Sequence, residues 1–411
     1  MILLLLFLNS LFAQLYFPTS NESWETISPA ELNWCVEYES ELDNFLDTTD
    51  TKAFIILKDG KLAYEKYFNG FARDSVWYWA SAAKSLTSVL VGIAQENNKL
   101  QITDKTSKYL GENWTALDKE KEDLITIYHQ LSMTTGLDES TNPNEDKSPD
   151  KLTYKADAGN RWYYYNVPYL LLHDVLEKAY NQNINIITNQ VLKNKIGMQG
   201  LWFDNLFISK ALDAARFGLL IMNDGVWKEE KIYNKDLSYY SEMINSSQSL
   251  NPAYGYLWWL NGKDNYLQPG LEFKFNGYIV PSAPKNMFMA AGKNDQRIYI
   301  DKERGIVIVR FGEPGDEIAL AVSGYDEKLW QKVNNLICNT TKVENLPTSY
   351  HFENDLIIFN SKVEYVIYDL QGRILDYGNS TYLDTRRYKG MYLLKVSDNS
   401  NTYLIKVISK Y

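Results

Sequence analysis

The hydrophobic pattern early in the chain predicts a β-hairpin followed by a buried helix. Ala53–Leu57 and Lys61–Phe68 are rich in strand-forming residues, and Asp59-Gly60 between them is a strong hairpin signal. From Ser81 to Gln95 the apolar residues recur at helical spacing and also fill the other faces. We therefore expect this helix to be buried nearly all round.

The middle of the chain, from about Leu100 to Asn276, has a mostly helical pattern with long polar loops such as Glu139–Lys151. Three strand-like runs follow with short turns between them: Met287–Ala291, Arg297–Asp301 and Gly305–Phe311. Further helices are expected around Pro29–Leu46 and Asp326–Cys338. The order predicts an α+β architecture, an antiparallel sheet flanked by terminal helices plus a helical subdomain, with the cleft between them.

After Cys338 the composition changes. Asn339-Thr340-Thr341 and Leu346-Pro347-Thr348 are typical of a linker, so we assign residues 14–340 to the main domain and 341–411 to a C-terminal module. Short runs separated by glycine predict that this module is small and all-β: Val363–Leu370, Arg373–Tyr377, Met391–Val396 and Thr402–Ile408.

Residues 1–13 are predicted to be a signal peptide. Their apolar run ends at Phe12, and Ala13 provides a small residue for cleavage before Gln14. The run is too short to span a bilayer, so no transmembrane segment is expected in the mature chain. It departs from the signal pattern because no Lys or Arg precedes it, and a buried N-terminal strand is the alternative.

The charge of the chain limits its expected binding partners, and its cysteine content bears on the cellular compartment. The 52 acidic and 42 basic residues give a net charge of −10 without a basic block, so nucleic acid is not an expected partner. In an exported protein the two cysteines, Cys35 and Cys338, can form a disulfide, with two unpaired buried thiols as the alternative. If their helices pack together, the bridge closes a loop of roughly 300 residues.

The central chemical signal is the S-x-x-K pattern of Ser81 and Lys84 at the start of the apolar helix. Residues at i and i+3 share a helix face, so the lysine amine can reach the serine hydroxyl. A lysine can deprotonate a serine only if its own pKa falls, and burial has that effect. The alternatives are that Ser81 is a helix cap and Lys84 a solvated charge.

Other hydrolase classes and cofactors lack support in the sequence. His129, His173 and His351 are widely separated and form no zinc-binding pattern, and no G-x-S-x-G surrounds Ser81. His129 is interpreted as structural. No metal and no cofactor are expected.

Several ordered segments resemble the superfamily of serine β-lactamases, penicillin-binding proteins and related esterases, over roughly residues 30–338. The matching segments, beside the S-x-x-K pattern, are Ile125–Leu137, the Y-x-N motif of Tyr164 and Asn166, Asp213–Gly218 and Tyr254–Trp259. The resemblance implies that Ser81 attacks a carbonyl and that Lys84 and Tyr164 share general-base and general-acid work. It also implies that Asn166 orients the lysine and the substrate.

The resemblance implies an oxyanion hole made of the backbone N–H groups of Ser81 and Lys293, after Gly292 of the third motif. Many family members have Lys-Thr-Gly there, whereas this chain has Ala290-Ala291-Gly292. That departure is similar to the branch of esterases and aminohexanoate-oligomer hydrolases, and it puts β-lactamase activity in doubt. Arg297 or Lys293 is a candidate replacement cation.

The Trp258-Trp259 pair is a candidate for the pocket lining, although core packing is the more common place for such a pair. The segment Val366–Arg373, with Lys389–Val396, resembles the C-terminal sorting domain of the Bacteroidetes type IX secretion system. That resemblance implies the export machinery as a partner and a secreted or surface-attached protein of a Gram-negative bacterium. The alternative is a β-sandwich that binds carbohydrate or protein.

The leading hypothesis is therefore a secreted serine hydrolase that acts on a small-molecule ester, an amide or a short peptide through an acyl-Ser81 intermediate. A peptidoglycan D-amino-acid peptidase or a β-lactamase is the close alternative. A surface binding protein that kept the fold without turnover is the alternative from another class.

Overall fold

The computed structural model describes residues 15–19, 24–233, 237–315, 322–338, 350–353, 356–369, 373–388, 390–397 and 402–409. The predicted signal peptide and the predicted linker lie outside these residues. The chain divides into two units, Met1–Ile337 and Cys338–Tyr411.

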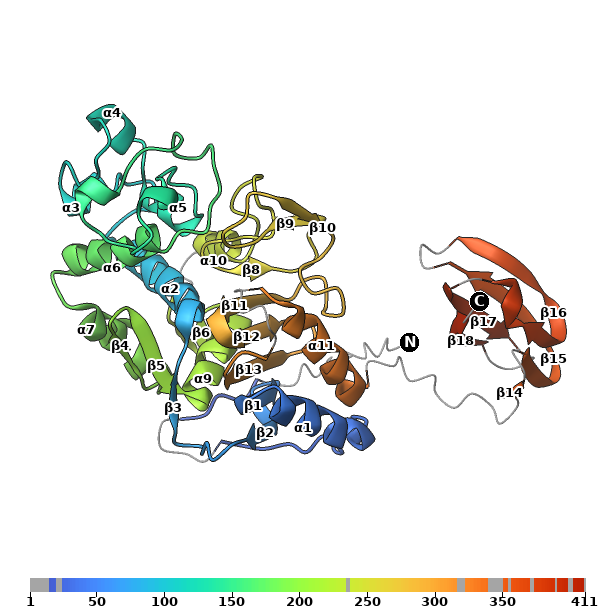
Figure 1. Ribbon diagram of the computed structural model, residues 1–411. Helices are drawn as coiled ribbons and strands as arrows, with labels where there is room; N and C mark the ends of the chain where they lie inside the picture. The colour runs from blue at the N-terminus through green and yellow to red at the C-terminus, as the bar shows by residue number, and fades with distance from the viewer. Residues whose placement is uncertain are drawn as a thin grey trace, which may run out of the picture. The chain divides into compact units, whose positions relative to one another are not determined.

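The first unit is built on a six-stranded antiparallel sheet (Figure 1). In spatial order its strands are β2 (Lys61–Tyr67), β1 (Thr51–Lys58), β13 (Ile306–Gly312), β12 (Gln296–Asp301), β11 (Phe288–Gly292) and β8 (Trp259–Leu260). The predicted hairpin and the predicted late meander are both confirmed. Asp59 and Gly60 have φ angles of 49° and 86°, as the two central positions of a type I′ hairpin turn require.

Helices cover both faces of this sheet, as the alternation along β12 shows. Ile298 faces α9 (Ala211–Met222), where a Cβ built on Gly218 would come within 3.1 Å of the isoleucine side chain. The next residue, Tyr299, points to the opposite face and meets the ring of Trp330 in α11 (Gly324–Ile337), with ring centroids 5.6 Å apart. The predicted antiparallel sheet with flanking helices is thus confirmed; the terminal helix α11 covers one face, and α9, from the middle of the chain, covers the other.

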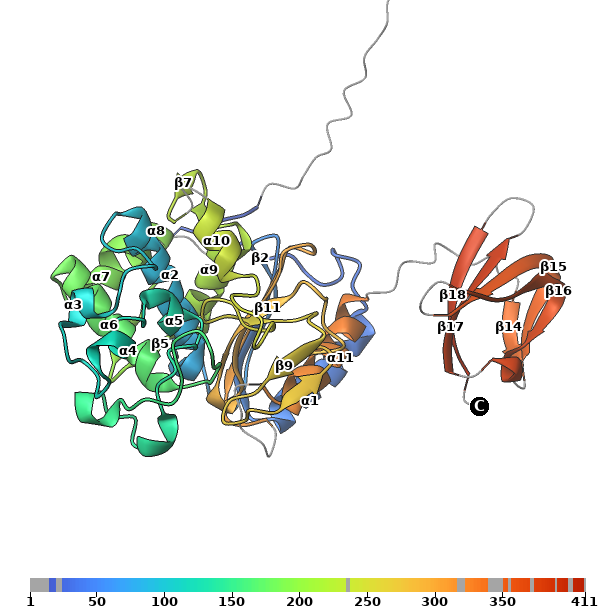
Figure 2. The ribbon, with the colours of Figure 1, turned by 90° about the horizontal axis from the view of Figure 1, so that it is seen from above.

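The helical part gathers on one side of α2 (Ala83–Glu96), with the large sheet on its other side (Figures 1 and 2). Its other helices are α3 (Ser107–Leu110), α4 (Lys119–Glu122), α5 (Ile127–Leu131), η3 (Glu139–Thr141), η4 (Pro149–Lys151), α6 (Asn166–Tyr180), α7 (Ile184–Thr188), η5 (Asn189–Lys193) and α8 (Asn194–Ile196). A further helix, α10 (Leu237–Met243), lies on the sheet side of α2, near β8 (Figure 1). As predicted, α2 is buried on all sides from Ala83 to Ala94.

The expectation of a mostly helical middle segment is incomplete, because short strands interrupt it. They are β4 (Leu201–Phe203), β5 (Leu206–Lys210), β6 (Val226–Trp227), β7 (Glu230–Lys231), β8, β9 (Asn265–Leu267) and β10 (Lys274–Asn276). Strands of two to five residues are too short for a period-2 pattern to stand out. Moreover, β5 takes its pairing from the distant β3 (Val76–Tyr78).

The predicted disulfide is confirmed, and it lies beside the terminal helices of the first unit. The first segment begins later than expected, with η1 (Val36–Tyr38) and α1 (Glu39–Thr48). Cys35 precedes η1, and its N–H donates to the carbonyl of Leu336 in α11 at 2.9 Å. Both cysteines of the chain are disulfide-bonded, so Cys35 pairs with Cys338.

The second unit is an antiparallel β-structure, as predicted. Its strands are β14 (Tyr350–Glu353), β15 (Leu356–Tyr368), β16 (Ile374–Asp384), β17 (Gly390–Ser397) and β18 (Thr402–Ser409), with the short helix η7 (Thr385–Arg387). They pair in the order β14-β15-β17-β18, with β16 also on β15. Ile357, Ile367 and Leu394 are among the residues of its small core. Across the described parts of both units, we find no helix that is long and apolar enough to cross a membrane.

Candidate active site

Ser81 lies in a 3-10 turn, η2 (Ala80–Ala82), that leads directly into α2. The backbone N–H of Trp79 donates to the carbonyl of Phe207 at 2.9 Å, and the Trp79 indole donates to the Ser209 hydroxyl at 2.9 Å. Ala80 has a φ of 47°, a left-handed conformation that alanine rarely adopts. The peptide before Ser81 is therefore fixed in a strained geometry, as is common at functional sites.

The Lys84 amine donates a hydrogen bond to the Ser81 Oγ at 2.8 Å. Ser81 is partly exposed, whereas only 3% of Lys84 is accessible to solvent. This burial lowers the pKa of Lys84 from its ordinary value of 10.5 to about 7, and the negative charge of Glu145 acts in the opposite direction. The structure therefore brings together a serine hydroxyl and an amine that loses its proton near neutral pH.

Tyr164 faces the same pair from the segment that precedes α6. That segment is fixed where the N–H of Tyr163 donates to the carbonyl of Met133 at 3.0 Å. The Tyr164 ring stacks on Trp259, with centroids 5.8 Å apart. Burial raises the pKa of the Tyr164 phenol, while a side-chain hydrogen bond with Ser81 acts in the opposite direction. Tyr164 thus keeps its proton at the neutral pH at which the Lys84 amine releases one.

Asn166 is the first residue of α6, and its described hydrogen bond goes to Glu145 rather than to Lys84. The amide nitrogen of Asn166 donates to the Glu145 carboxylate. Its side-chain oxygen is buried and has no hydrogen-bond partner among the described residues. Burial of a hydrogen-bond acceptor without a partner costs folding free energy, so buried acceptors are usually paired. This oxygen is therefore a position where a ligand N–H could bond.

The backbone of Gly292, at the end of β11, packs directly against the turn that holds Ser81. A Cβ at this position would lie 2.5 Å from the Trp79 carbonyl oxygen and 3.0 Å from the Ser81 nitrogen. Only glycine allows this approach. The next residue, Lys293, begins the short helix η6 (Lys293–Asp295), and its side chain is exposed.

Arg297 does not lie at the surface as a free cation. Its guanidinium is fully buried, donates to Asp326 at 2.6 Å and to Asp295 at 3.0 Å, and donates to the Gly292 carbonyl at 2.6 Å. Asp326 and Asp295 are carboxylates, so the charge of Arg297 is balanced inside the protein. This placement argues against Arg297 as a replacement for the missing motif cation.

The two adjacent tryptophans have different surroundings. Trp258 is fully buried between Phe217, on which it stacks, and Phe288, which it meets edge-on. Trp259 is also buried but packs on the Tyr164 ring. Core packing therefore accounts for Trp258, whereas Trp259 supports the site from behind Tyr164.

Other segments that resemble the family act as structural supports. The Ser85 hydroxyl of α2 donates to the Leu257 carbonyl at 2.7 Å, and the Leu257 N–H donates to the Leu131 carbonyl at 3.0 Å. His129 caps its own helix through Thr126, as its structural interpretation anticipates. These contacts connect α2, α5 and the segment before β8, and so fix the base of the site.

Four residues near Lys84 were not singled out as site residues by the sequence analysis: Glu145, Tyr169, Thr87 and His173. Glu145 lies in Glu139–Lys151, one of the long polar loops that the sequence predicts. The spacing offered a signal for the others, since Thr87 is three residues after Lys84 and His173 is four after Tyr169, each pair on one helix face. Only the packing of α2 against α6 shows that these two faces meet.

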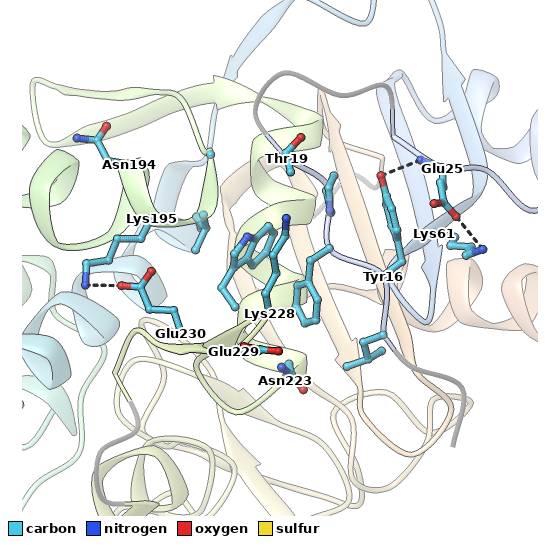
Figure 3. Close-up of a pocket in the computed structure, with 16 residues that line it drawn as sticks. Tyr16, Thr19, Glu25, Lys61, Asn194, Lys195, Asn223, Lys228, Glu229 and Glu230 are labelled. Atoms are coloured by element: carbon cyan, nitrogen blue, oxygen red, sulfur yellow. Dashed lines mark hydrogen bonds and ion pairs between the residues drawn. The ribbon is translucent and has the colours of Figure 1, made fainter. Parts of the chain in front are cut away.

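A separate cavity of about 1130 Å³ lies elsewhere in the first unit, and none of the proposed catalytic residues lines it (Figure 3). Residues 15–19, 194–197 and 227–230 form much of its wall. Its rim carries the ion pairs Lys61–Glu25 at 2.8 Å and Lys195–Glu230 at 3.1 Å. The cavity is therefore distinct from the Ser81 site.

A sequence model described as Beta-lactamase matches residues 46–312, a range that includes Ser81, Lys84, Tyr164 and Gly292. The chain belongs to the beta-lactamase family. Members of this family are typically serine hydrolases. No protein of curated function matches this beta-lactamase-family sequence significantly.

Solved structures share the fold of this beta-lactamase-family chain at low sequence identity. A Bacillus anthracis protein assigned as a 6-aminohexanoate-dimer hydrolase is 17% identical, with a TM-score of 0.57, covering 77% of this chain and 87% of that one. The octameric penicillin-binding protein homologue from Pyrococcus abyssi is 15% identical, with a TM-score of 0.55 and coverage of 92% and 91%. The hydrolase EstCE1, which has promiscuous acyltransferase activity, is 13% identical, with a TM-score of 0.56 and coverage of 74% and 99%.

Proposed function

We propose that the protein is a serine hydrolase that cleaves an ester or amide bond through an acyl-Ser81 intermediate. The observation that carries this proposal is the 2.8 Å hydrogen bond between Ser81 and a buried Lys84 whose pKa is lowered to about 7. A neutral amine in this position is a base of suitable strength at neutral pH.

In the proposed mechanism, Lys84 accepts the Ser81 proton as Oγ attacks the substrate carbonyl carbon. Tyr164, which keeps its proton because burial raises its pKa, delivers a proton to the departing alcohol or amine and regains one from Lys84. Water then attacks the acyl carbon, releases the carboxylic acid and restores the Ser81 hydroxyl. Both proton carriers thus return to their starting states.

The proposed oxyanion hole consists of the backbone N–H groups of Ser81 and Lys293. Ser81 lies in the first turn of a helix, where N–H groups lack acceptors within the helix. Gly292 brings the end of β11 against that turn. Each such donor is typically worth about 3 kcal/mol of transition-state stabilisation. Asn166 is proposed to orient the substrate through its unpaired oxygen.

The proposed substrate is an ester or linear amide without a carboxylate at the position that Lys-Thr-Gly serves in other enzymes. Ala290 and Ala291 supply neither a cation nor a hydroxyl there, and Arg297 is already paired with two buried carboxylates. Lys293 is exposed and remains the nearest candidate along the chain. Hydrolysis of a short-chain ester should therefore exceed that of a β-lactam.

The test is hydrolysis of a short-chain p-nitrophenyl ester by the mature chain, with Ser81→Ala, Lys84→Ala and the control Ser85→Ala. We expect the first two to lose at least about a thousandfold in kcat/KM, because nucleophile and base are removed. Ser85→Ala removes a structural hydrogen bond to Leu257 but no reacting group, so it should lose far less activity than the first two variants. Equal rates in Ser81→Ala and the parent would contradict the assignment and favour a non-catalytic binding protein.

Two further substrates separate the close alternatives. Release of D-alanine from muramyl peptides, in preference to ester hydrolysis, would support a peptidoglycan peptidase. Rapid turnover of a chromogenic cephalosporin would support a β-lactamase. In each case the Ser81→Ala variant supplies the blank rate.

We also propose that the protein is exported and that the C-terminal unit directs it to the export machinery. The Cys35–Cys338 disulfide supports an oxidising compartment. Deletion of residues 341–411 in a host with type IX secretion should retain the hydrolase inside the cell. Unchanged secretion of the shortened chain would contradict this role.

A further inference from the structure

The Lys84 amine lies between the faces of two tyrosine rings. Its nitrogen is 5.0 Å from the ring centroid of Tyr164 and 4.5 Å from that of Tyr169. Both distances are within the range of a cation–π interaction, which strengthens when the pair is shielded from water. Tyr169 is 4% exposed, so its ring lies behind the lysine rather than at the surface where substrate enters.

The Tyr169 ring is itself supported by a chain of buried groups. Its edge meets the His173 ring at a centroid distance of 5.4 Å, and His173 meets the Trp202 ring at 4.5 Å. The Tyr169 phenol donates to the Asn205 carbonyl at 3.5 Å and shares a side-chain hydrogen bond with Thr87, whose hydroxyl also contacts the His173 Nε2 at 2.9 Å. Burial lowers the pKa of His173 to about 3, so this histidine stays neutral and adds no second charge beside Lys84.

The proposed mechanism gives Tyr169, Thr87 and His173 no proton to transfer. We propose that Tyr169 is a positioning residue, whose ring face holds the Lys84 amine against Ser81 and stabilises the protonated form of that lysine. This inference rests on the proposed function, because it concerns the same Ser81–Lys84 pair. Thr87 and His173 fix the orientation of the ring.

The groups that face Lys84 are few and can be separated by mutation. Among the described residues they are Ser81 on η2, Tyr164 just before α6, Tyr169 and His173 along α6, and Glu145 on the preceding loop. Glu145 also favours the charged lysine. Removal of the ring alone should therefore change the pKa of Lys84 while the carboxylate remains.

The test compares Tyr169→Phe, which keeps the ring face, with Tyr169→Leu and Tyr169→Met, which remove it. Loss of the ring destabilises protonated Lys84, so its pKa should fall by about one unit and the acid limb of kcat/KM should move to lower pH by the same amount. We expect kcat to fall about tenfold at its plateau with KM nearly unchanged, because the amine is less well held. Tyr169→Phe should stay within about threefold of the parent.

The matched control is Tyr180→Leu on the same helix, whose ring carries Lys99 at 5.4 Å instead of Lys84. Its acid limb should not move. A titration of ¹³Cε-labelled lysine by NMR, with the Lys84 resonance identified by its loss in Lys84→Arg, measures the same pKa without turnover. This readout keeps the inference testable even if ester hydrolysis does not depend on Ser81.

An unchanged Lys84 pKa in folded Tyr169→Leu or Tyr169→Met would overturn the inference, as would an equal shift in Tyr169→Phe. Failure of the proposed function looks different, since Ser81→Ala would then match the parent rate. The positioning role of Tyr169 would be established if the Lys84 pKa fell in both ring-removing variants and kept its parent value in Tyr169→Phe and Tyr180→Leu.

Discussion

The Arg297 guanidinium donates to the Gly292 carbonyl at 2.6 Å while it is fully buried between Asp295 and Asp326. It therefore connects the end of β11, beside Ser81, to η6 and α11. A charged group that was a candidate for substrate binding instead fixes the backbone of the site.

Replacement of Arg297 by methionine should destabilise the first unit by about 3–5 kcal/mol, because two buried carboxylates lose their shared partner. Chemical denaturation measures the change. The control is Arg73→Met, which breaks the more exposed ion pair with Glu65 and should cost less than about 1 kcal/mol. Similar losses in the two variants would contradict a structural role for the buried pair.

Gly292→Ala should reduce kcat/KM by about a hundredfold or more, because its Cβ would push against the backbone of Trp79 and Ser81 and misplace the nucleophile. Steady-state kinetics measure the loss. Gly270→Ala is the control, since no atom lies within 4 Å of a Cβ at that loop position. That variant carries only local backbone strain from its φ of 78°, so its catalytic constants should match the parent.

The pH dependence of kcat/KM should identify the base. If Lys84 is the base, activity is low when the amine is protonated, rises through about pH 7 and then reaches a plateau. Tyr164, whose pKa is raised, would as base give a rate that still increases above pH 10. A profile measured from pH 5 to pH 10 distinguishes the two, and absence of a limb near neutral pH would exclude Lys84.

Loss of the disulfide should lower the free energy of unfolding by up to about 5 kcal/mol, because the bridge closes a loop of about 300 residues in the unfolded chain. The variant to measure is Cys35→Ser combined with Cys338→Ser, so that no single thiol remains. Urea denaturation of the parent with a reductant should give the same midpoint as this variant. The reductant should leave the variant itself unchanged.

The sequence predicted the sheet and the S-x-x-K helix because their signals are local. The Asp59-Gly60 turn and the period of α2 are readable within a few residues, and the same holds for the three strands β11 to β13. The ring of Tyr169 against Lys84 and the pairing of Arg297 with Asp326 depend on contacts between distant elements. No periodicity encodes such contacts, so they required the structure.

The short strands of the middle segment were also not predictable from local sequence patterns. β3 pairs with β5, more than a hundred residues later, and each offers only three to five residues of pattern. The run Val76-Trp77-Tyr78-Trp79 is rich in aromatic residues, but only the structure shows that the Trp79 indole donates to Ser209 and so anchors the nucleophile turn. Local composition indicated an unusual segment there but not its partner.

The strand order of the large sheet also affects how the chain can fold during synthesis. Ile55 of β1 pairs with Val309 of β13, so a ribosome must finish almost the whole first unit before its earliest strand acquires that partner. Until then β1 and β2 form a hairpin with an open edge, and such edges recruit strands from other chains. Folding of this long-range topology is intrinsically slow. Before β13 is available, the free edge of this hairpin must therefore be kept from pairing with strands of other chains.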